Sequence, residues 1–142
     1  MDLADVYAQF EPAWDEFAKG NPEPAKALYS HREDATLANP FGPAVRGWDQ
    51  VSKTLEYASS RFRDGAFIAT ERIAEYATAD LACRLDLEHW KARVGERPEV
   101  EPFDLRVTTT LRREGDDWKI VHRHADPITS LDPDGPLRAS TS

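Results

Sequence analysis

Two histidines and an aspartate near the end of the chain have the types and spacing of acid–base side chains. His122, His124 and Asp126 alternate along the chain, and side chains two positions apart lie on the same face of a β-strand. Trp118 and Ile120 begin that face, which indicates that it points toward the core. Because neutral imidazole is a good general base near neutral pH, the pattern predicts a pocket wall that moves a proton. Asp126 is expected to favour charge on the nearer ring, His124.

A third imidazole is expected to reach the same cavity. Pairing around the last hairpin places Thr109 beside His122 and Val107 beside His124, and the preceding strand then brings His89 over Val107. The alternative, in which each ring is a hydrogen-bonded wall residue without chemistry, stays open. A His-x-His pair with a third histidine also matches a zinc arrangement. A pocket without metal and without cofactor is favoured.

Hydrophobic periodicity predicts the elements that position these residues. Apolar residues at helical spacing indicate helices over 3–19, 22–29 and 48–62, with Pro12 either kinking the first helix or restarting it. A short strand over 35–39 ends at Pro40. Four longer alternating strands follow, over 67–77, 81–90, 103–112 and 118–126. On the second of these, the face expected to point inward carries Leu81, Cys83, Leu85, Leu87 and His89.

This order of elements predicts an α+β fold. Short turns between long strands make antiparallel neighbours, and the helices precede the strands instead of alternating with them. The simplest arrangement is a curved antiparallel sheet wrapped around the N-terminal helices, with a cavity inside the curve. We expect one domain over residues 1–130. The segment 131–142, rich in Pro, Gly and Ser, is expected to be a disordered tail.

Composition limits the classes of function. The chain has 142 residues, a net charge of −8 and a pI near 5.0, which argues against nucleic acid or an anionic membrane as a partner. Cys83 is the single cysteine, so neither an internal disulfide nor a cysteine-based zinc site can form. No apolar run approaches the length of a membrane span. The predicted location is the cytoplasm.

Three stretches of the sequence resemble a known superfamily. They are residues 28–40, residues 46–51 (Arg-Gly-Trp-Asp-Gln-Val) and residues 111–124. Their order and spacing resemble the nuclear transport factor 2-like superfamily, which includes ketosteroid isomerase and the SnoaL-like polyketide cyclases. The resemblance implies a cone-shaped half-barrel with a deep pocket, usually paired as a homodimer.

The catalytic residues of the steroid isomerases are not carried over with this resemblance. Their base position, just before the proline that ends the first strand, is Asn39, which cannot abstract a proton. Their two oxyanion-hole positions correspond to Ala13 and Thr109. Ketosteroid isomerisation by that mechanism is therefore not expected. The SnoaL-like aldol cyclases use a pocket aspartate, and the resemblance implies Asp126 for that role.

The preferred interpretation is a small-molecule pocket protein for a hydrophobic or partly polar organic ligand. If it is an enzyme, it is a cofactor-free isomerase, cyclase or dehydratase with His122 or His124 as base and Asp126 beside them. The residues expected to contact the ligand are Trp14, Phe17, Asn39, Trp48, Leu87, His89, Val107 and Thr109. The alternatives are a ligand-binding protein without chemistry and a homodimeric association module. The dimer is expected to use the opposite face of the sheet, around Arg84, Trp90, Arg106 and Arg123.

Overall fold

The computed structural model describes residues 1–137, which form an α+β fold. The first half of the chain is mainly helical, and its elements are α1 (Leu3–Ala8), α2 (Phe10–Ala18), α3 (Glu23–Ala27), β1 (Thr36–Ala38), β2 (Val45–Arg46) and α4 (Trp48–Ser60). The second half is four long strands, which are β3 (Phe62–Ala77), β4 (Leu81–Val94), β5 (Glu101–Glu114) and β6 (Asp117–Asp126). The predicted fold class is confirmed, and the order of elements agrees with the prediction except that the first helix is divided into α1 and α2 and that the short strand β2 was not predicted.

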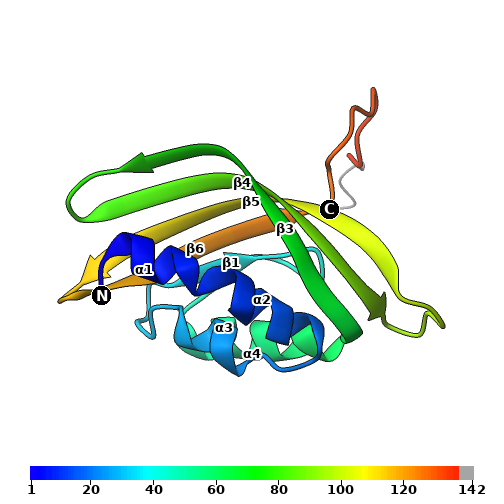
Figure 1. The fold of residues 1–142 in the computed structure, drawn as a ribbon, viewed down its shortest axis with the longest axis horizontal. Coiled ribbons are helices and arrows are strands. Elements are labelled where there is room, and N and C mark those ends of the chain that lie inside the picture. Colours follow the sequence, from blue (N-terminus) through cyan, green and yellow to red (C-terminus); the bar gives the residue numbers. More distant parts are fainter. Residues whose placement is uncertain (138–142) are drawn as a thin grey trace, which may run out of the picture.

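The strands form one six-stranded curved sheet with the order β2-β1-β6-β5-β4-β3 (Figure 1). Strands β3 to β6 are an antiparallel meander, in which short turns join β3 to β4 and β5 to β6 and a loop of residues 95–100 joins β4 to β5. The short strand β1 adds to the far side of β6 in parallel, because its chain reaches the sheet from the helical half. The sheet is therefore open, with β3 and β2 at its two edges.

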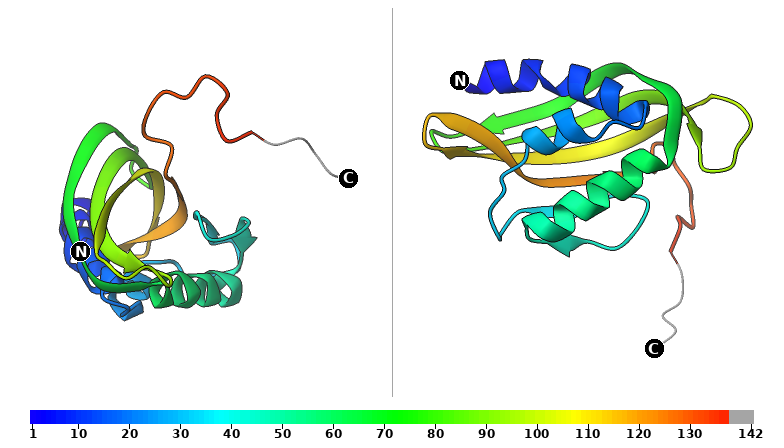
Figure 2. Two further views of the ribbon diagram at one scale, coloured as in Figure 1. Left: turned by 90° about the vertical axis from the view of Figure 1, so that its right-hand side faces the viewer. Right: turned by 90° about the horizontal axis from the view of Figure 1, so that it is seen from below.

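The helices cover one face of this sheet (Figure 1). Viewed along the long strands, the sheet curls into an arc whose hollow side is covered by the helices (Figure 2). Helix α2 packs against β3 and α3, and it buries the apolar stripe of Phe10, Trp14 and Phe17. Pro12 lies in the first turn of α2, where proline is tolerated, so the chain restarts a helix there after a break at Gln9.

Strand β4 presents the opposite face from the one predicted. Its buried side chains are Ala82, Arg84, Asp86, Glu88, Trp90 and Ala92. The apolar side chains expected inside are on the outer face, where Leu85 is 36% exposed. The prediction placed the more apolar face of β4 inside. It was wrong because charged side chains can be buried when each of them forms an ion pair or hydrogen bond. Arg84 donates to Asp86 at 3.1 Å, and Arg123 donates twice to Glu88.

A β-bulge at Val121 divides β6 into two halves of opposite phase. Thr110 pairs with His122 while the next residue of β5, Leu111, pairs with Ile120, so Val121 is the extra residue. A bulge of this kind bends the strand and reverses which residues face inward beyond it. Trp118 and Ile120 are buried as predicted, but after the bulge the buried side chains are Arg123 and Ala125.

The expected tail begins where the regular elements end. Residues 127–137 contain no helix or strand. The remainder of that predicted tail, 138–142, lies outside the described residues. None of the helices in residues 1–137 is long and apolar enough to span a bilayer.

Candidate functional site

A cavity of about 280 Å³ lies between the concave face of the sheet and the helices. It is near the lower limit for small-molecule sites. Helices α2 and α4 form one side, and the adjoining ends of β3, β4, β5 and β6 form the other. The lining is mainly apolar and includes the aromatic rings of Trp14, Phe17, Phe41, Phe62, Trp90 and Phe103.

Three of these rings form a near-parallel group on the sheet side. The ring centroids of Phe62 and Phe103 are 5.5 Å apart with 16° between the planes, and those of Trp90 and Phe103 are 6.0 Å apart with 15°. Phe41, from the loop after β1, meets Phe62 edge-on at 5.5 Å. Offset and edge-to-face contacts of this kind stabilise aromatic clusters beyond the area they bury. The result is a flat apolar wall.

Polar groups are concentrated at one place in the cavity, around Arg123 and Tyr29. Arg123 forms a two-pronged ion pair with Glu88, with nitrogen–oxygen distances of 2.7 and 3.0 Å. The Glu88 carboxylate also accepts a hydrogen bond from Trp90 Nε1 at 3.0 Å. Burial lowers the pKa of Arg123, but the neighbouring carboxylate more than offsets this and raises it. The guanidinium is therefore charged although it is buried.

The Tyr29 hydroxyl beside this ion pair has no hydrogen-bond partner among the described residues. Tyr29 is buried and lines the cavity. Burial raises the pKa of its phenol well above the usual value, and the Glu88 charge acts in the same direction against Arg123. The phenol is therefore a neutral donor near neutral pH. A buried hydroxyl without a partner is costly, and because this oxygen is itself fully buried, a ligand in the cavity would contact it only if the Tyr29 side chain shifted.

A second polar group adjoins the first along β4, on the side toward α1. Asp86 accepts from Arg84, whose guanidinium lies 4.3 Å from the centre of the Tyr7 ring. Burial raises the pKa of Asp86, opposed first by Arg84. Burial and then Glu75 raise the pKa of Tyr7 to about 12. None of these side chains is part of the cavity lining.

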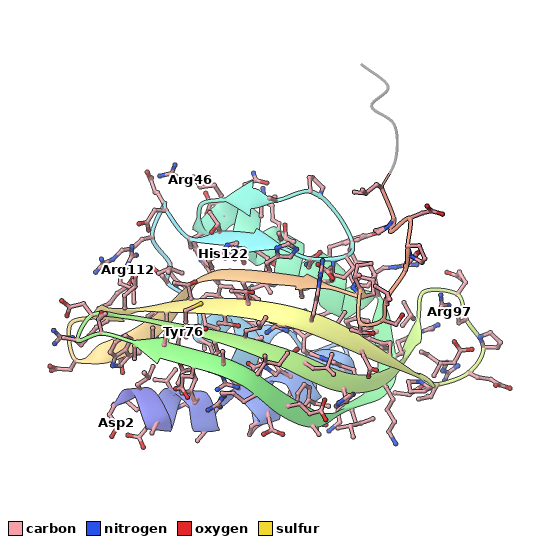
Figure 3. The ribbon with its side chains drawn as sticks, turned by 90° about the horizontal axis from the view of Figure 1, so that it is seen from above. Asp2, Arg46, Tyr76, Arg97, Arg112 and His122 are labelled. Carbon is pink, nitrogen blue, oxygen red and sulfur yellow. The ribbon has the colours of Figure 1, made fainter. Side chains whose placement is uncertain are left out.

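The histidines predicted to form the catalytic centre are outside the cavity. His122, His124 and Asp126 follow the bulge at Val121, so they project from the outer face of the sheet, and the expectation that they enter the pocket is wrong. Figure 3, which looks onto that face, shows His122 between β1 and β6. His124 Nε2 lies 3.3 Å from Asp126, whose carboxylate also accepts from Arg106 at 2.6 Å.

His122 nevertheless has the predicted direction of pKa shift. Burial against β1, and then the charge of His124, lower its pKa. Its Nδ1 lies 2.8 Å from the Thr36 hydroxyl. The pKa of His122 is therefore lowered by burial beside β1 on the outer side of the sheet, and not by burial in a ligand cavity.

His89 is also on the outer face, because β4 has the reverse phase. Its two ring nitrogens contact Asp104 at 2.7 Å and Glu71 at 3.2 Å. The hydrogen bond to Asp104, followed by the one to Glu71, raises its pKa. The three imidazoles thus do not share a cavity. In the described part of the chain, no group of three or more His, Cys, Asp or Glu side chains could hold a metal ion.

The residues predicted to contact a ligand divide into three groups. Trp14, Phe17 and Asn39 line the cavity. Val107 and Thr109 are on the inner face but are buried in the core outside the lining.

The other three predicted contacts were misplaced. Leu87 and His89 are on the outer face of β4, opposite the buried Asp86 and Glu88. Trp48 begins α4 and stacks on His31 with 3.8 Å between ring centres, in a surface depression away from the cavity.

A match to a family model shows which protein family the chain belongs to. Residues 6–129 match the model described as the SnoaL-like domain. The chain belongs to this family. A search of curated proteins gave no match to this SnoaL-like domain.

Solved structures share the fold of this SnoaL-like domain. A nuclear transport factor 2-like superfamily protein from Salmonella enterica serovar Typhimurium superimposes with a TM-score of 0.74 at 15% identity, covering 94% of this chain and 93% of that one. A proposed dehydratase of the same superfamily from Streptomyces avermitilis gives 0.72 at 18%, covering 90% and 94%. A proposed calcium/calmodulin-dependent protein kinase II association domain from Xanthomonas campestris gives 0.71 at 15%, covering 91% and 87%. At these identities the likeness establishes the fold alone.

The polar residues of this SnoaL-like cavity were missed from the sequence. Arg123 was expected on the outer face, and Glu88 and Tyr29 were not among the residues expected to contact a ligand. The available signal was the opposite charge of Glu88 and Arg123 on two strands of the predicted sheet. The opposite charges become informative only when it is known that strand pairing brings Glu88 and Arg123 into contact.

Proposed function

We propose that this SnoaL-like domain binds a small, mainly apolar organic molecule in the cavity between the sheet and the helices. The apolar walls, which include several aromatic rings, enclose the hydrocarbon part of the ligand. Asn39 is held at the cavity by its own turn, in which its Oδ1 accepts from the Phe41 backbone nitrogen at 3.0 Å.

The observation that carries the proposal is the preformed cavity itself, whose lining is mainly apolar and includes a few polar side chains, among them Asn39 and Arg123. Ligand sites typically combine apolar walls with a few polar groups that fix orientation. The cavity matches both parts of that description.

Fluorescence titration tests binding directly, because Trp14 and Trp90 line the cavity. We expect 2-acetylnaphthalene, a two-ring ketone, to quench tryptophan emission saturably. Ala58 lines the cavity from α4 and is buried, so Ala58→Leu should fill the space and abolish the saturable quenching. The matched control is Ala77→Leu, at an exposed position outside the lining. Equal binding by wild type and Ala58→Leu would refute the proposal.

Proton-transfer catalysis is the second candidate, and the Streptomyces avermitilis protein of the same fold is a proposed dehydratase. No histidine is among the residues that line the cavity in the described part of the chain. The nearest buried carboxylate, Glu88, already accepts three hydrogen bonds. We therefore rank binding ahead of catalysis. Exchange of the methyl protons of 2-acetylnaphthalene into deuterated water, above the buffer rate, would reverse that order.

We also propose that two copies pair through the outer face of the sheet, in the cytoplasm as the composition predicts. Of the residues first expected in that interface, Arg84, Trp90 and Arg123 are buried on the inner face, which leaves Arg106. Exposed apolar side chains on the outer face support pairing, with Tyr76 67% exposed and Leu85 36% exposed. The Xanthomonas campestris protein of the same fold is a proposed association domain. A monomer measured by light scattering at high micromolar concentration would contradict the proposed dimer.

A further inference from the structure

Two histidines lie side by side on the outer face of the sheet. Beyond the bulge, His122, labelled in Figure 3, and His124 are on the same face of β6. Residues two positions apart on a strand have Cα atoms about 7 Å apart. The side chains beside the two rings are short, because His124 lies between Ala38 and Thr108 and His122 lies between two threonines. These neighbours leave the rings standing above the sheet, and the His124 side chain is 54% exposed.

One nitrogen of each ring is held by a neighbour, which leaves the lone pair on the other. Thr36 Oγ1 donates to the Val121 carbonyl oxygen at 3.3 Å, so it accepts from His122 Nδ1 at 2.8 Å, and the lone pair is on Nε2. His124 Nε2 donates to Asp126 at 3.3 Å, and its lone pair is on Nδ1. Metal-bound histidines typically donate their second ring nitrogen in this way, which fixes the ring for the metal. The two rings therefore have the supporting contacts of metal ligands.

One chain does not complete a metal site at this pair. Across residues 1–137, no group of three or more His, Cys, Asp or Glu side chains could hold a metal ion. Zn²⁺ takes four ligands in structural sites, with imidazole nitrogens at about 2.0–2.1 Å. A second copy can supply the two missing nitrogens, because a twofold axis brings the same residues of both chains together.

The pair lies on the face that we propose for pairing. Leu85, one of the exposed apolar side chains that support pairing, is in the same cross-strand row as His124, with Thr108 between them. Each chain also has a net charge of −8, and two such chains repel each other. A cation held between the copies would reduce that repulsion.

We propose that His122 and His124 of two copies together bind one Zn²⁺ ion across the interface between their outer faces. This inference rests on the proposed dimer. Four neutral imidazoles form a nitrogen set that suits zinc, and each copy supplies half of it. The site lies apart from the cavity, because both histidines project from the opposite face of the sheet. The ion therefore controls pairing and does not contact a ligand in the cavity.

The first experiment measures association of the full chain, without a polyhistidine tag, by analytical ultracentrifugation in EDTA and in increasing Zn²⁺. If the dimer alone binds the ion, free Zn²⁺ at about ten times the dissociation constant of the site tightens the dimer about tenfold. Calorimetry should give one ion for two chains. One ion per chain without association would overturn the proposal.

The proposed dimer and the zinc site fail in different ways. A dimer with the same dissociation constant in EDTA and in Zn²⁺ would overturn the site and leave the dimer standing. A chain that is monomeric at high micromolar concentration in both conditions would remove both. A chain that pairs only in Zn²⁺ supports the site and shows that pairing depends on the ion.

Single substitutions locate the site. His124→Gln, and separately His122→Gln, should abolish the effect of Zn²⁺ on association. The matched control is His89→Gln, which removes another imidazole of the outer face, one that contacts Asp104 and Glu71, and it should keep the full effect. A wild-type response to Zn²⁺ in His124→Gln would overturn the assignment. Co²⁺ provides a readout on the wild-type chain that does not depend on variants, since the visible spectrum of tetrahedral Co²⁺ should appear with dimer formation, and an octahedral spectrum would overturn the four-histidine site.

Discussion

Breaking the buried ion pair between Glu88 and Arg123 should cost a large part of the stability of this domain. Either Glu88→Gln or Arg123→Met leaves one charged group buried without its partner, which typically costs about 3–5 kcal/mol. A domain of this size is stable by roughly 10 kcal/mol, so each single variant should still fold. The midpoint of thermal unfolding should fall by about 6–20 °C, at roughly 2–4 °C per kcal/mol.

The double variant should recover most of this loss. With both charges removed, the glutamine introduced by Glu88→Gln still offers its Oε1 to Trp90, and the methionine introduced by Arg123→Met fills the guanidinium volume, so no buried charge is left unpaired. Urea unfolding of the four proteins in a double-mutant cycle should give a coupling of at least about 3 kcal/mol. The control is the pair of Arg106 and Asp126 on the outer face, with a distance of 2.6 Å and Arg106 55% exposed, where exposed pairs typically contribute under about 1 kcal/mol. Additive single effects at Glu88 and Arg123 would refute the argument, because they would mean that the two charges are not desolvated together.

Four further predictions concern other parts of the chain. A methyl group at Gly65 would approach the Lys91 and Ala18 carbonyl oxygens to 2.5 and 2.7 Å, whereas one at Gly42 meets nothing within 4 Å. Gly65→Ala should therefore lower the free energy of unfolding by about 1–3 kcal/mol and Gly42→Ala should not, as urea titration will show. Because the folded-state pKa of His122 is lowered, the unfolded chain binds its proton first as the pH falls below about 6.5. His122→Gln should then remove a loss of stability on the acid side, and stability curves that coincide at every pH would contradict this. The pKa of His89 is raised, so it stabilises the fold below about pH 6.5 and that contribution is lost as the pH rises through the folded-state pKa; His89→Gln should remove this opposite dependence in the same titration. Finally, with Asn39 at the base position, isomerisation of Δ5- to Δ4-ketosteroids should equal the background rate, and measurable turnover lost in Asn39→Ala would show otherwise.

The sequence predicted the fold well because the fold follows from local periodicity. The buried faces of α2 and β5 are those that hydrophobic spacing predicted, with Val107, Thr109 and Leu111 all buried. The order of elements and the antiparallel meander follow from segment lengths and short turns. These features depend on the spacing of residues within one element, and one sequence contains that information.

The polar part of the site could not be predicted in the same way, because it depends on strand phase and on pairing between elements. Strand β4 buries Arg84, Asp86 and Glu88 only because partners exist on the same and other strands. The bulge in β6 is a single unpaired residue, Val121, with no glycine or proline to mark it. Choosing the more apolar face therefore exchanged the inner and outer faces of β4, and strict alternation exchanged them in the half of β6 that follows the bulge.

The bulge at Val121 has a consequence for comparing this chain with its homologues. Deletion of Val121 would leave a regular strand in which Ile120, Arg123 and Ala125 keep their faces, so the cavity would retain its polar residues while the sheet curved less. Deletion of any neighbouring residue in place of Val121 gives the same chain length and a nearly identical sequence. In an alignment, a gap in this stretch therefore belongs opposite Val121, and a homologue without the extra residue should hold a shallower cavity with the same chemistry. A homologue that keeps the length but pairs regularly would instead turn histidine in place of arginine toward the cavity, so the presence of the bulge matters more to the chemistry of the cavity than the length of the strand.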